Sequence, residues 1–401
     1  MWASLSQVKP PGNSALVPTD VVAVVLPPGP PWLDIVREIW DAGAVLFPID
    51  VRLPVAATRA LLQHAKPTVL LDGSGWTRRA DGLPAPEVAA IVHTSGTGGD
   101  PKLVGLDRAA IAAAVDASSE ALSATAQDRW LCCLPLAHIG GILVLLRAAL
   151  LGAPVVVHDR FDPDRFGAEP DVGFTSIVPT MLFRLLEVGV DLTSFHKLLV
   201  GGAHLPGRLR ERAEVAGARI VETYGLTESC GGVVYDGRPL PGTQIRVEDD
   251  EIVLSGPTIM RGYHLDPEAT RRVRTPDGWL RTGDVGELDR GGRLHVAGRM
   301  DELILTGGEK VWPQEVEVVL GDHPKIREVA VAGRPDEEWG ERVVAHVVPA
   351  DPSDPPDLQE LRDFASSRLP RYTAPSDLEL TEQIPRTANG KIRRSALHGQ
   401  E

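Results

Sequence analysis

A run of glycine and hydroxyl residues follows a short apolar segment near residue 90. It reads Thr94-Ser95-Gly96-Thr97-Gly98-Gly99-Asp100-Pro101-Lys102 and comes directly after the predicted strand Val88–His93. Glycines let the backbone turn so that several N–H groups converge, and the hydroxyls and Lys102 add the further donors that a polyphosphate requires. A Pro-Lys pair closes the run, so it is not a Walker A loop. A hairpin turn rich in glycine and serine remains the alternative.

Two further motifs offer oxygen and hydroxyl groups. In Tyr224-Gly225-Leu226-Thr227-Glu228, the threonine can donate to a phosphate and the carboxylate can hold Mg²⁺, which prefers hard oxygen ligands. A helix cap followed by a first-turn glutamate would look the same. In Arg281-Thr282-Gly283-Asp284, an aspartate after a predicted tight turn could accept hydrogen bonds from two ribose hydroxyls. Alone, this motif is typical of a turn.

Two late segments also carry polar residues at turns. Gly298-Arg299-Met300-Asp301-Glu302-Leu303-Ile304 runs on to Gly307-Gly308-Glu309-Lys310, and a basic loop, Pro385-Arg386-Thr387-Ala388-Asn389-Gly390-Lys391, lies near the C-terminus. A lone late lysine is usually a solvated surface residue. Lys391 becomes a candidate functional residue only because the other motifs precede it in the sequence.

The elements that must position these residues alternate between strand-like and helix-like patterns, which predicts an α/β fold. Several predicted strands end in loops that carry Gly, Thr, Glu or His, and ligands bind at the carboxyl edge of an open parallel sheet. The predicted strands and helices of this region are Val21–Leu26, Trp32–Ala42 (helix), Ala44–Phe47, Thr68–Leu71, a helix capped by Asp107, Leu198–Val200 and Ile220–Thr223.

From about residue 240 the pattern changes to short extended runs, which predicts a small antiparallel subdomain. The last hundred or so residues have strands of their own and a helix, Leu358–Leu369, that Asp357 and Glu360 can cap. A segment of this size can fold alone. We therefore expect an N-terminal domain over 1–300, with parallel and mixed sheets flanked by helices, and a small mobile α+β domain over 301–401.

The composition narrows the class of protein. The 401 residues include 41 Lys and Arg against 55 Asp and Glu, a net charge of −14. This acidity argues against a nucleic-acid partner, which would need a basic surface. Three cysteines indicate neither a disulfide framework nor metal-ligand spacing, and no apolar run is long enough to cross a bilayer. We expect a soluble cytoplasmic protein without membrane insertion; a homodimer is one assembly that the sequence leaves open.

Taken in order, these motifs resemble those of the adenylate-forming superfamily of acyl- and aryl-CoA ligases, luciferases and peptide-synthetase adenylation domains. The resemblance covers nearly the whole chain and extends to the early segment Ala42–Pro54. It implies that the chain activates a carboxylic acid with ATP and Mg²⁺ as an acyl-adenylate, releases pyrophosphate, and passes the acyl group to coenzyme A. One departure is Gly98, where the superfamily usually has a second Thr or Ser; the loss of this donor predicts weaker ATP binding.

The resemblance also implies roles for single residues. Tyr224 would stack on adenine, Thr227 would contact the α-phosphate, Glu228 would coordinate Mg²⁺, Asp284 would bind the ribose and Lys391 would bridge the attacking carboxylate and the nucleotide. The other residues that it places around the nucleotide are Thr94, Ser95, Gly96, Thr97, Gly98, Gly99, Lys102, Gly201, Gly202, Ala203, Gly225 and Arg299.

For the second half-reaction, the resemblance implies a rotation of the C-terminal domain about a hinge at Asp301. This movement would withdraw Lys391 and bring Gly307 and Gly308 toward the channel for the thiol. No protein nucleophile is needed in either step, so the cysteines and serines require no catalytic triad.

The identity of the acid rests on fewer residues. His138 precedes an apolar stretch in which Arg147 stands alone among aliphatic residues, and a buried guanidinium requires an anion nearby. The anion can be an internal carboxylate or a second carboxylate on the substrate. Alternatively, the arginine side chain reaches solvent and needs no such partner. With the stretch Tyr224–Gly237, which contains Gly231 and Gly232, this pattern is similar to the o-succinylbenzoate–CoA ligases of menaquinone biosynthesis. Alternatives are another aryl- or medium-chain acyl-CoA ligase, an adenylation domain that loads a carrier-protein thiol, and a nucleotide-binding regulator without turnover.

Overall fold

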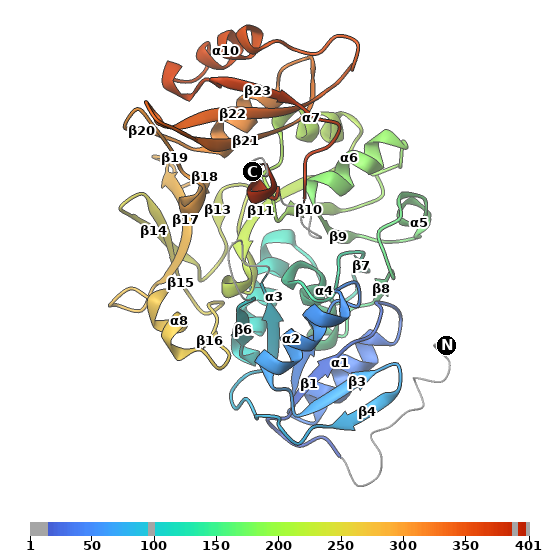
Figure 1. Cartoon of the computed structure of the whole chain (residues 1–401). Helices are drawn as coiled ribbons and strands as arrows, with labels where there is room; N and C mark the ends of the chain where they lie inside the picture. The colour runs from blue at the N-terminus through green and yellow to red at the C-terminus, as the bar shows by residue number, and fades with distance from the viewer. Residues whose placement is uncertain (1–14, 95–100, 387–391, 398–401) are drawn as a thin grey trace.

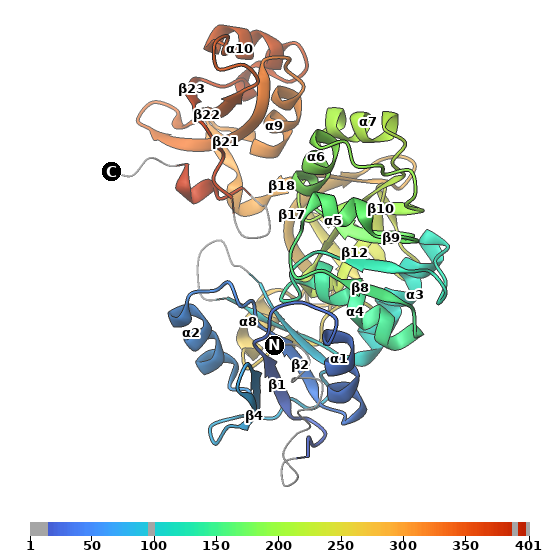
Figure 2. The same cartoon turned by 90° about the vertical axis from the view of Figure 1, so that its right-hand side faces the viewer.

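The computed structural model describes residues 15–94, 101–386 and 392–397. Among these residues, the N-terminal part forms two seven-stranded sheets and one four-stranded sheet, and the C-terminal part forms a further sheet of five strands. In Figure 1 the C-terminal part sits above the rest, and the turned view of Figure 2 shows it over the region where the N-terminal sheets meet. The predicted α/β class with a separate small C-terminal unit is confirmed.

The first sheet has the strand order β16-β6-β5-β2-β1-β3-β4. Its strands are Val21–Val24 (β1), Val45–Pro48 (β2), Val69–Asp72 (β3), Gly75–Arg78 (β4), Ala90–His93 (β5), Leu103–Leu106 (β6) and Gly262–Tyr263 (β16). The central strands are parallel, whereas β5 and β6 pair in antiparallel register. The segment between β5 and β6 is the glycine-rich run, so the sheet carries that run as the connection of a hairpin.

Helices cover both faces of this sheet because the strands are apolar on both sides. Successive side chains of a strand point to opposite faces. Val22 accordingly packs in one core with Trp32 of α1 (Trp32–Asp41), and Val21 packs in another with Leu61 of α2 (Val55–Ala65).

The second sheet has the order β13-β12-β11-β10-β9-β7-β8. Its strands are Trp130–Cys132 (β7), Val155–Val157 (β8), Phe174–Ile177 (β9), Lys197–Gly201 (β10), Ile220–Leu226 (β11), Gly231–Tyr235 (β12) and Arg238–Pro239 (β13). The strands from β8 to β11 are parallel, and β12 returns antiparallel to β11. This pairing extends β11 to Leu226, three residues beyond the predicted end of the strand at Thr223.

Helices from different parts of the chain cover the second sheet. They are Arg108–Leu122 (α3), Ile139–Leu151 (α4), Pro163–Ala168 (α5), Pro179–Glu187 (α6) and Gly207–Val215 (α7). Asp107 caps α3 as predicted, through its carboxylate and the backbone N–H of Ala110. Residues of α1 and α4 share one core, which joins the two large sheets and holds their carboxyl edges in a fixed relation.

The small antiparallel subdomain is confirmed. Its strands are Gln244–Glu248 (β14), Glu251–Ser255 (β15), Leu280–Leu288 (β17) and Leu294–Arg299 (β18). The helix α8 (Pro267–Arg272), between β15 and β17 in the chain, contacts β16 of the first sheet. The predicted tight turn at residues 281–284 is wrong, because these residues lie inside β17. Gly283 has a φ of 69°, and its N–H donates to the Glu251 carboxylate at 2.9 Å. A glycine in the left-handed region allows the irregularity at which the pairing of β17 with β15 shifts register.

The C-terminal part has its own apolar core, separate from the cores of the sheets below it. Its elements are Ile304–Thr306 (β19), Glu309–Val311 (β20), Pro313–Gly321 (α9), Ile326–Asp336 (β21), Gly340–Pro349 (β22), Leu358–Ser366 (α10) and Asp377–Leu380 (β23). The predicted capping box at α10 is present, with Asp357 accepting from the Glu360 N–H and Glu360 accepting from the Asp357 N–H. None of the helices in the described ranges combines the length and apolarity needed to cross a membrane.

Candidate functional site

A cavity of about 2450 Å³ lies where the two large sheets, the antiparallel subdomain and the C-terminal part meet. Most of the predicted site residues within the described ranges line it. They are Thr94, Lys102, His138, Arg147, Gly201, Gly202, Ala203, Tyr224, Gly225, Thr227, Glu228, Gly231, Gly232, Asp284, Arg299 and Asp301. The carboxyl ends of β5, β10 and β11 all open into this space, as expected for parallel strands.

At the end of β11, Tyr224 and Asp284 are in direct contact. The Tyr224 hydroxyl donates to Asp284 Oδ2 at 2.8 Å, although 60 residues separate the two. Burial, with the nearby Asp284 carboxylate, raises the pKa of Tyr224 well above its usual value, so the hydroxyl stays protonated and remains a donor. The phenol ring and the carboxylate are therefore held as one unit.

Arg299 joins this pair to the connection between the two parts of the chain. Its Nη1 donates to Asp284 Oδ1 at 3.0 Å, and its Nε donates to Asp301 Oδ1 at 3.2 Å. Residues 300–302 form a 3₁₀ turn that leads from β18 into β19. One guanidinium thus contacts both the predicted ribose carboxylate and the predicted hinge residue.

The predicted metal carboxylate lies on a 3₁₀ turn, Thr227–Ser229, that follows β11. Glu228 Oε1 accepts a hydrogen bond from the Tyr263 hydroxyl at 2.8 Å. Within the described ranges, no group of three or more His, Cys, Asp or Glu residues could hold a metal by itself. A single hard carboxylate at a cavity fits Mg²⁺ bound mainly through the phosphates of a nucleotide, which is how Mg²⁺ usually accompanies ATP.

The two ends of the glycine-rich run lie at the same cavity. The Thr94 N–H donates to the Lys102 carbonyl oxygen at 2.9 Å, and this bond continues the pairing of β5 with β6. Ser95, Gly96, Thr97, Gly98 and Gly99 lie outside the described residues. Lys102 Nζ stands 5.2 Å from the centre of the Tyr263 ring.

Arg147 lies inside α4 and is only 3% exposed. Its Nη1 donates to Ser119 Oγ at 2.6 Å and its Nη2 to Ser118 Oγ at 2.8 Å. The guanidinium also stands 4.3 Å from the centre of the Trp130 ring. No carboxylate of the described residues forms an ion pair with it, and burial lowers its pKa to about 10. Among the described residues, Arg147 therefore neither forms an ion pair with a carboxylate nor reaches solvent, although the Asp116 carboxylate acts on it electrostatically.

The surroundings of Arg147 belong to the cavity. His138 precedes the first turn of α4, and Gly231 and Gly232 lie on β12 beside it. A Cβ on Gly231 would lie 3.1 Å from Leu143 Cδ2, and the backbone there has a φ of 94°. Glycine at this position therefore permits β12 to approach α4 closely.

Comparisons with known proteins agree with this geometry. The family model of AMP-binding enzymes matches residues 74–264, and the model of the AMP-binding enzyme C-terminal domain matches residues 315–391. A 2-succinylbenzoate–CoA ligase of Bacillus licheniformis is 36% identical over 78% of this chain and 70% of its own length. A probable 2-succinylbenzoate–CoA ligase of Mycobacterium tuberculosis is 38% identical over 78% of this chain and 84% of its own. The chain belongs to the AMP-binding enzyme family.

Other relatives and solved structures of this family extend the comparison. An indoleacetate–CoA ligase of Aromatoleum aromaticum is 36% identical over 81% of this chain and 70% of its own. The o-succinylbenzoate CoA synthetase of Bacillus subtilis, solved with an acyl-adenylate intermediate, matches with a TM-score of 0.86 and 28% identity over 100% of this chain and 92% of that one. The same synthetase solved with ATP and a magnesium ion matches with a TM-score of 0.83 over 95% and 90%. The predicted class, an AMP-forming acid–thiol ligase that uses ATP and Mg²⁺, is confirmed.

Some residues predicted from the AMP-binding family pattern are not tested by the geometry. Lys391 lies outside the described residues. Gly307 and Gly308 form the turn between β19 and β20 and are not among the described residues that line the cavity. Their predicted place in a thiol channel stays a prediction that depends on domain rotation.

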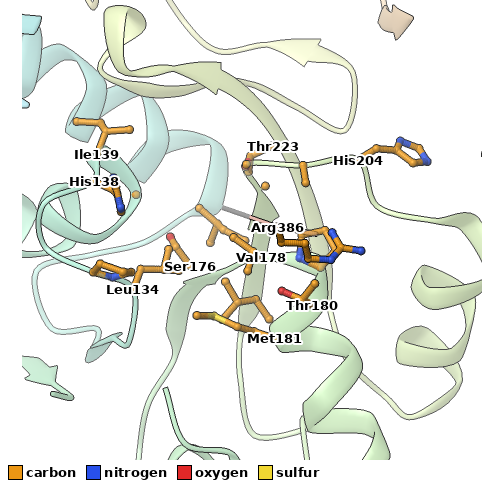
Figure 3. Close-up of a pocket in the computed structure, with 18 of the residues that line it drawn as sticks. Leu134, His138, Ile139, Ser176, Val178, Thr180, Met181, His204, Thr223 and Arg386 are labelled. Carbon is orange, nitrogen blue, oxygen red and sulfur yellow. The ribbon is translucent and has the colours of Figure 1, made fainter. Parts of the chain in front are cut away.

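The structure also brings residues to the site that the sequence pattern did not single out. His93, the last residue of β5, is 7% exposed and packs edge-on against His138, with ring centres 5.7 Å apart. Arg386 of the C-terminal part lines the same cavity as Val178 and Thr180 (Figure 3), and its Nη2 pairs with Glu328 at 2.9 Å. Polarity at the end of an apolar strand was a signal for His93. For Arg386 the only signal was its place in the basic loop before Lys391.

Proposed function

We propose that this protein joins o-succinylbenzoate to coenzyme A through an acyl-adenylate. In the first step a carboxylate oxygen attacks the α-phosphorus of ATP, a P–O bond forms, and pyrophosphate leaves. In the second, the thiolate of coenzyme A attacks the acyl carbonyl, and AMP leaves. The first step brings two anions together, so binding and charge neutralisation supply most of the rate enhancement.

The residues around the cavity divide this work. Asp284, which is held by Tyr224 and Arg299, can accept from the ribose, and the glycines at the end of β10 leave room for a flat base beside Tyr224. Glu228 would hold Mg²⁺, which neutralises phosphate charge when bound. Lys391, at the end of the match to the C-terminal family model, would supply a cation to the carboxylate and the nucleotide in the first step only.

Arg147 carries the assignment of the acid. It is a buried cation at the cavity with hydroxyl and π partners but without a carboxylate partner among the described residues. Buried charges in proteins are usually paired. A dicarboxylate that activates one carboxyl group and leaves the other ionised would complete this pair. The names of the relatives from Bacillus licheniformis and Mycobacterium tuberculosis support the same acid.

A second candidate substrate is an aryl monocarboxylate. The indoleacetate–CoA ligase relative favours it, because that protein is as similar in sequence as the Bacillus licheniformis ligase. In that case Arg147 would serve only to hold α3, α4 and the Trp130 ring together.

Acid-dependent exchange of pyrophosphate into ATP distinguishes these candidates. The panel consists of o-succinylbenzoate, benzoate, indoleacetate and a medium-chain fatty acid, each with ATP and Mg²⁺. We expect kcat/KM for o-succinylbenzoate to exceed that for each monocarboxylate by about a hundredfold or more, because a site built for a polar group rejects ligands that lack it. Equal or faster exchange with indoleacetate or benzoate would overturn the proposed acid.

A further inference from the structure

The carboxylate of Glu228 accepts a hydrogen bond from Tyr263, a residue that does not line the cavity. The hydroxyl of Tyr263 donates to Glu228 Oε1 at 2.8 Å, whereas Glu228 itself lines the cavity. The tyrosine is a fixed donor to one oxygen of the predicted metal ligand.

Tyr263 is itself held tightly on the other large sheet. It lies on β16, which pairs with β6, and Tyr263 stands opposite Val104 in that pairing. Its backbone N–H donates to Thr270 Oγ1 at 2.8 Å. Tyr263 is buried, so its ring has little freedom to turn away from Glu228.

The same strand also approaches the two segments that are predicted to bind phosphate. The N–H of Met260, just before β16, donates to the Glu228 carbonyl oxygen at 2.8 Å. Lys102, which precedes β6, places its ammonium 5.2 Å from the centre of the Tyr263 ring. The tyrosine therefore connects the Thr227–Ser229 turn of the second sheet with the end of the glycine-rich run on the first.

We propose that Tyr263 is a positioning residue for the magnesium–nucleotide complex, in that its hydroxyl occupies Glu228 Oε1 and turns Oε2 toward the metal. The inference rests on the proposed function for the role of Glu228. It predicts that the carboxylate binds the metal through one oxygen. It also predicts a fixed spacing between the Glu228 carboxylate and Lys102, because the side chain of Tyr263 contacts both.

The test is the substitution Tyr263→Phe, which removes the hydroxyl and retains the ring beside Lys102. Binding of Mn²⁺ to the full-length protein in the presence of ATP is followed by electron paramagnetic resonance, and the Mg²⁺ concentration for half-maximal pyrophosphate exchange is measured in parallel. We expect both the Mn²⁺ dissociation constant and the half-saturating Mg²⁺ concentration to rise about tenfold, as when the hydrogen-bond partner of a metal ligand is removed. A change of less than twofold in Mn²⁺ binding would overturn the proposal.

Two controls separate positioning from general damage. Binding of AMP without metal should be unchanged in Tyr263→Phe, and Tyr372→Phe, at an exposed tyrosine of the C-terminal part, should bind Mn²⁺–ATP like the unaltered protein. In a Glu228→Gln background, Tyr263→Phe should have no further effect on Mn²⁺ binding. A loss of AMP binding equal to that of Mn²⁺, or a full tenfold loss in the Glu228→Gln background, would contradict the proposal. Mn²⁺–ATP binding requires no acid, so these measurements test the role of Tyr263 even if the proposed acid is wrong.

Discussion

Replacement of Lys391 by alanine should lower the rate of acyl-adenylate formation by about a thousandfold and leave the transfer of a preformed acyl-adenylate to coenzyme A within about threefold of the unaltered rate. The attacking carboxylate and the polyphosphate repel each other, and a cation placed between them stabilises the charge that develops at the α-phosphorus; loss of one such group typically costs 10²–10³ in kcat. In the second half-reaction the thiolate attacks the acyl carbonyl and not a phosphorus, and the predicted rotation of the C-terminal part withdraws Lys391 from the site. The assignment of this residue rests on the motif and on the match of residues 315–391 to the family's C-terminal domain.

The two half-reactions are measured separately, by pyrophosphate exchange and by thioester formation from synthetic acyl-adenylate. The control is Lys66→Ala, at an exposed lysine that follows α2, which should affect neither half-reaction. Equal losses in both half-reactions for Lys391→Ala would refute the division of labour and, with it, the proposed rotation of the C-terminal part about Asp301.

Arg147→Leu should discriminate between acids according to their charge. We expect kcat/KM for o-succinylbenzoate to fall by about a hundredfold, because truncation of one partner of a buried charge pair costs about 2–5 kcal/mol. For benzoate the fall should stay below about threefold, because that acid has no second carboxylate for the guanidinium. The structural reason is the burial of Arg147 against Ser118 and Ser119 without a carboxylate among the described residues.

Arg108, at the start of α3, provides a control with a similar ring contact. Arg108 also lies over a tryptophan, with its guanidinium 4.5 Å from the centre of the Trp40 ring and a hydrogen bond to the Trp40 carbonyl oxygen, and it does not line the cavity. Arg108 is exposed, so Arg108→Leu should lower the unfolding temperature less than Arg147→Leu, and it should leave the ratio of kcat/KM values for the two acids unchanged. If Arg147→Leu weakens both acids equally, the arginine is structural and the dicarboxylate assignment falls.

Local patterns were sufficient to predict many elements of the fold. The alternation of apolar runs indicated β1, β2, β3 and β5 of the first sheet and β10 and β11 of the second. The polar caps at Asp107 and Asp357 marked the starts of α3 and α10, since a cap and its helix are close in sequence. The same locality explains the error at Asp284. A Thr-Gly-Asp sequence is typical of a turn, and only the pairing of β17 with β15 and β18 makes it a kinked strand.

The candidate site depended on contacts that local patterns do not contain. Tyr224 and Asp284 are 60 residues apart, and Glu228 and Tyr263 are 35 apart, yet each pair shares a hydrogen bond of 2.8 Å. Sequence order suggested that the motifs act together, but the individual pairings follow from sheet packing. The sequence therefore contained no signal for a role of Tyr263, because nothing near it distinguishes it from any other tyrosine at a strand edge.

We expect one cavity to bind ATP and o-succinylbenzoate together and to couple them. This expectation is tested most directly by incubation of the protein with ATP, Mg²⁺ and o-succinylbenzoate in the absence of coenzyme A, followed by mass spectrometry of the bound fraction. We expect bound o-succinylbenzoyl-AMP at up to one equivalent for each chain. It should disappear when coenzyme A is added, as the thioester and AMP appear in equal amounts. Absence of any adenylate under these conditions, with ATP bound and intact, would contradict this expectation.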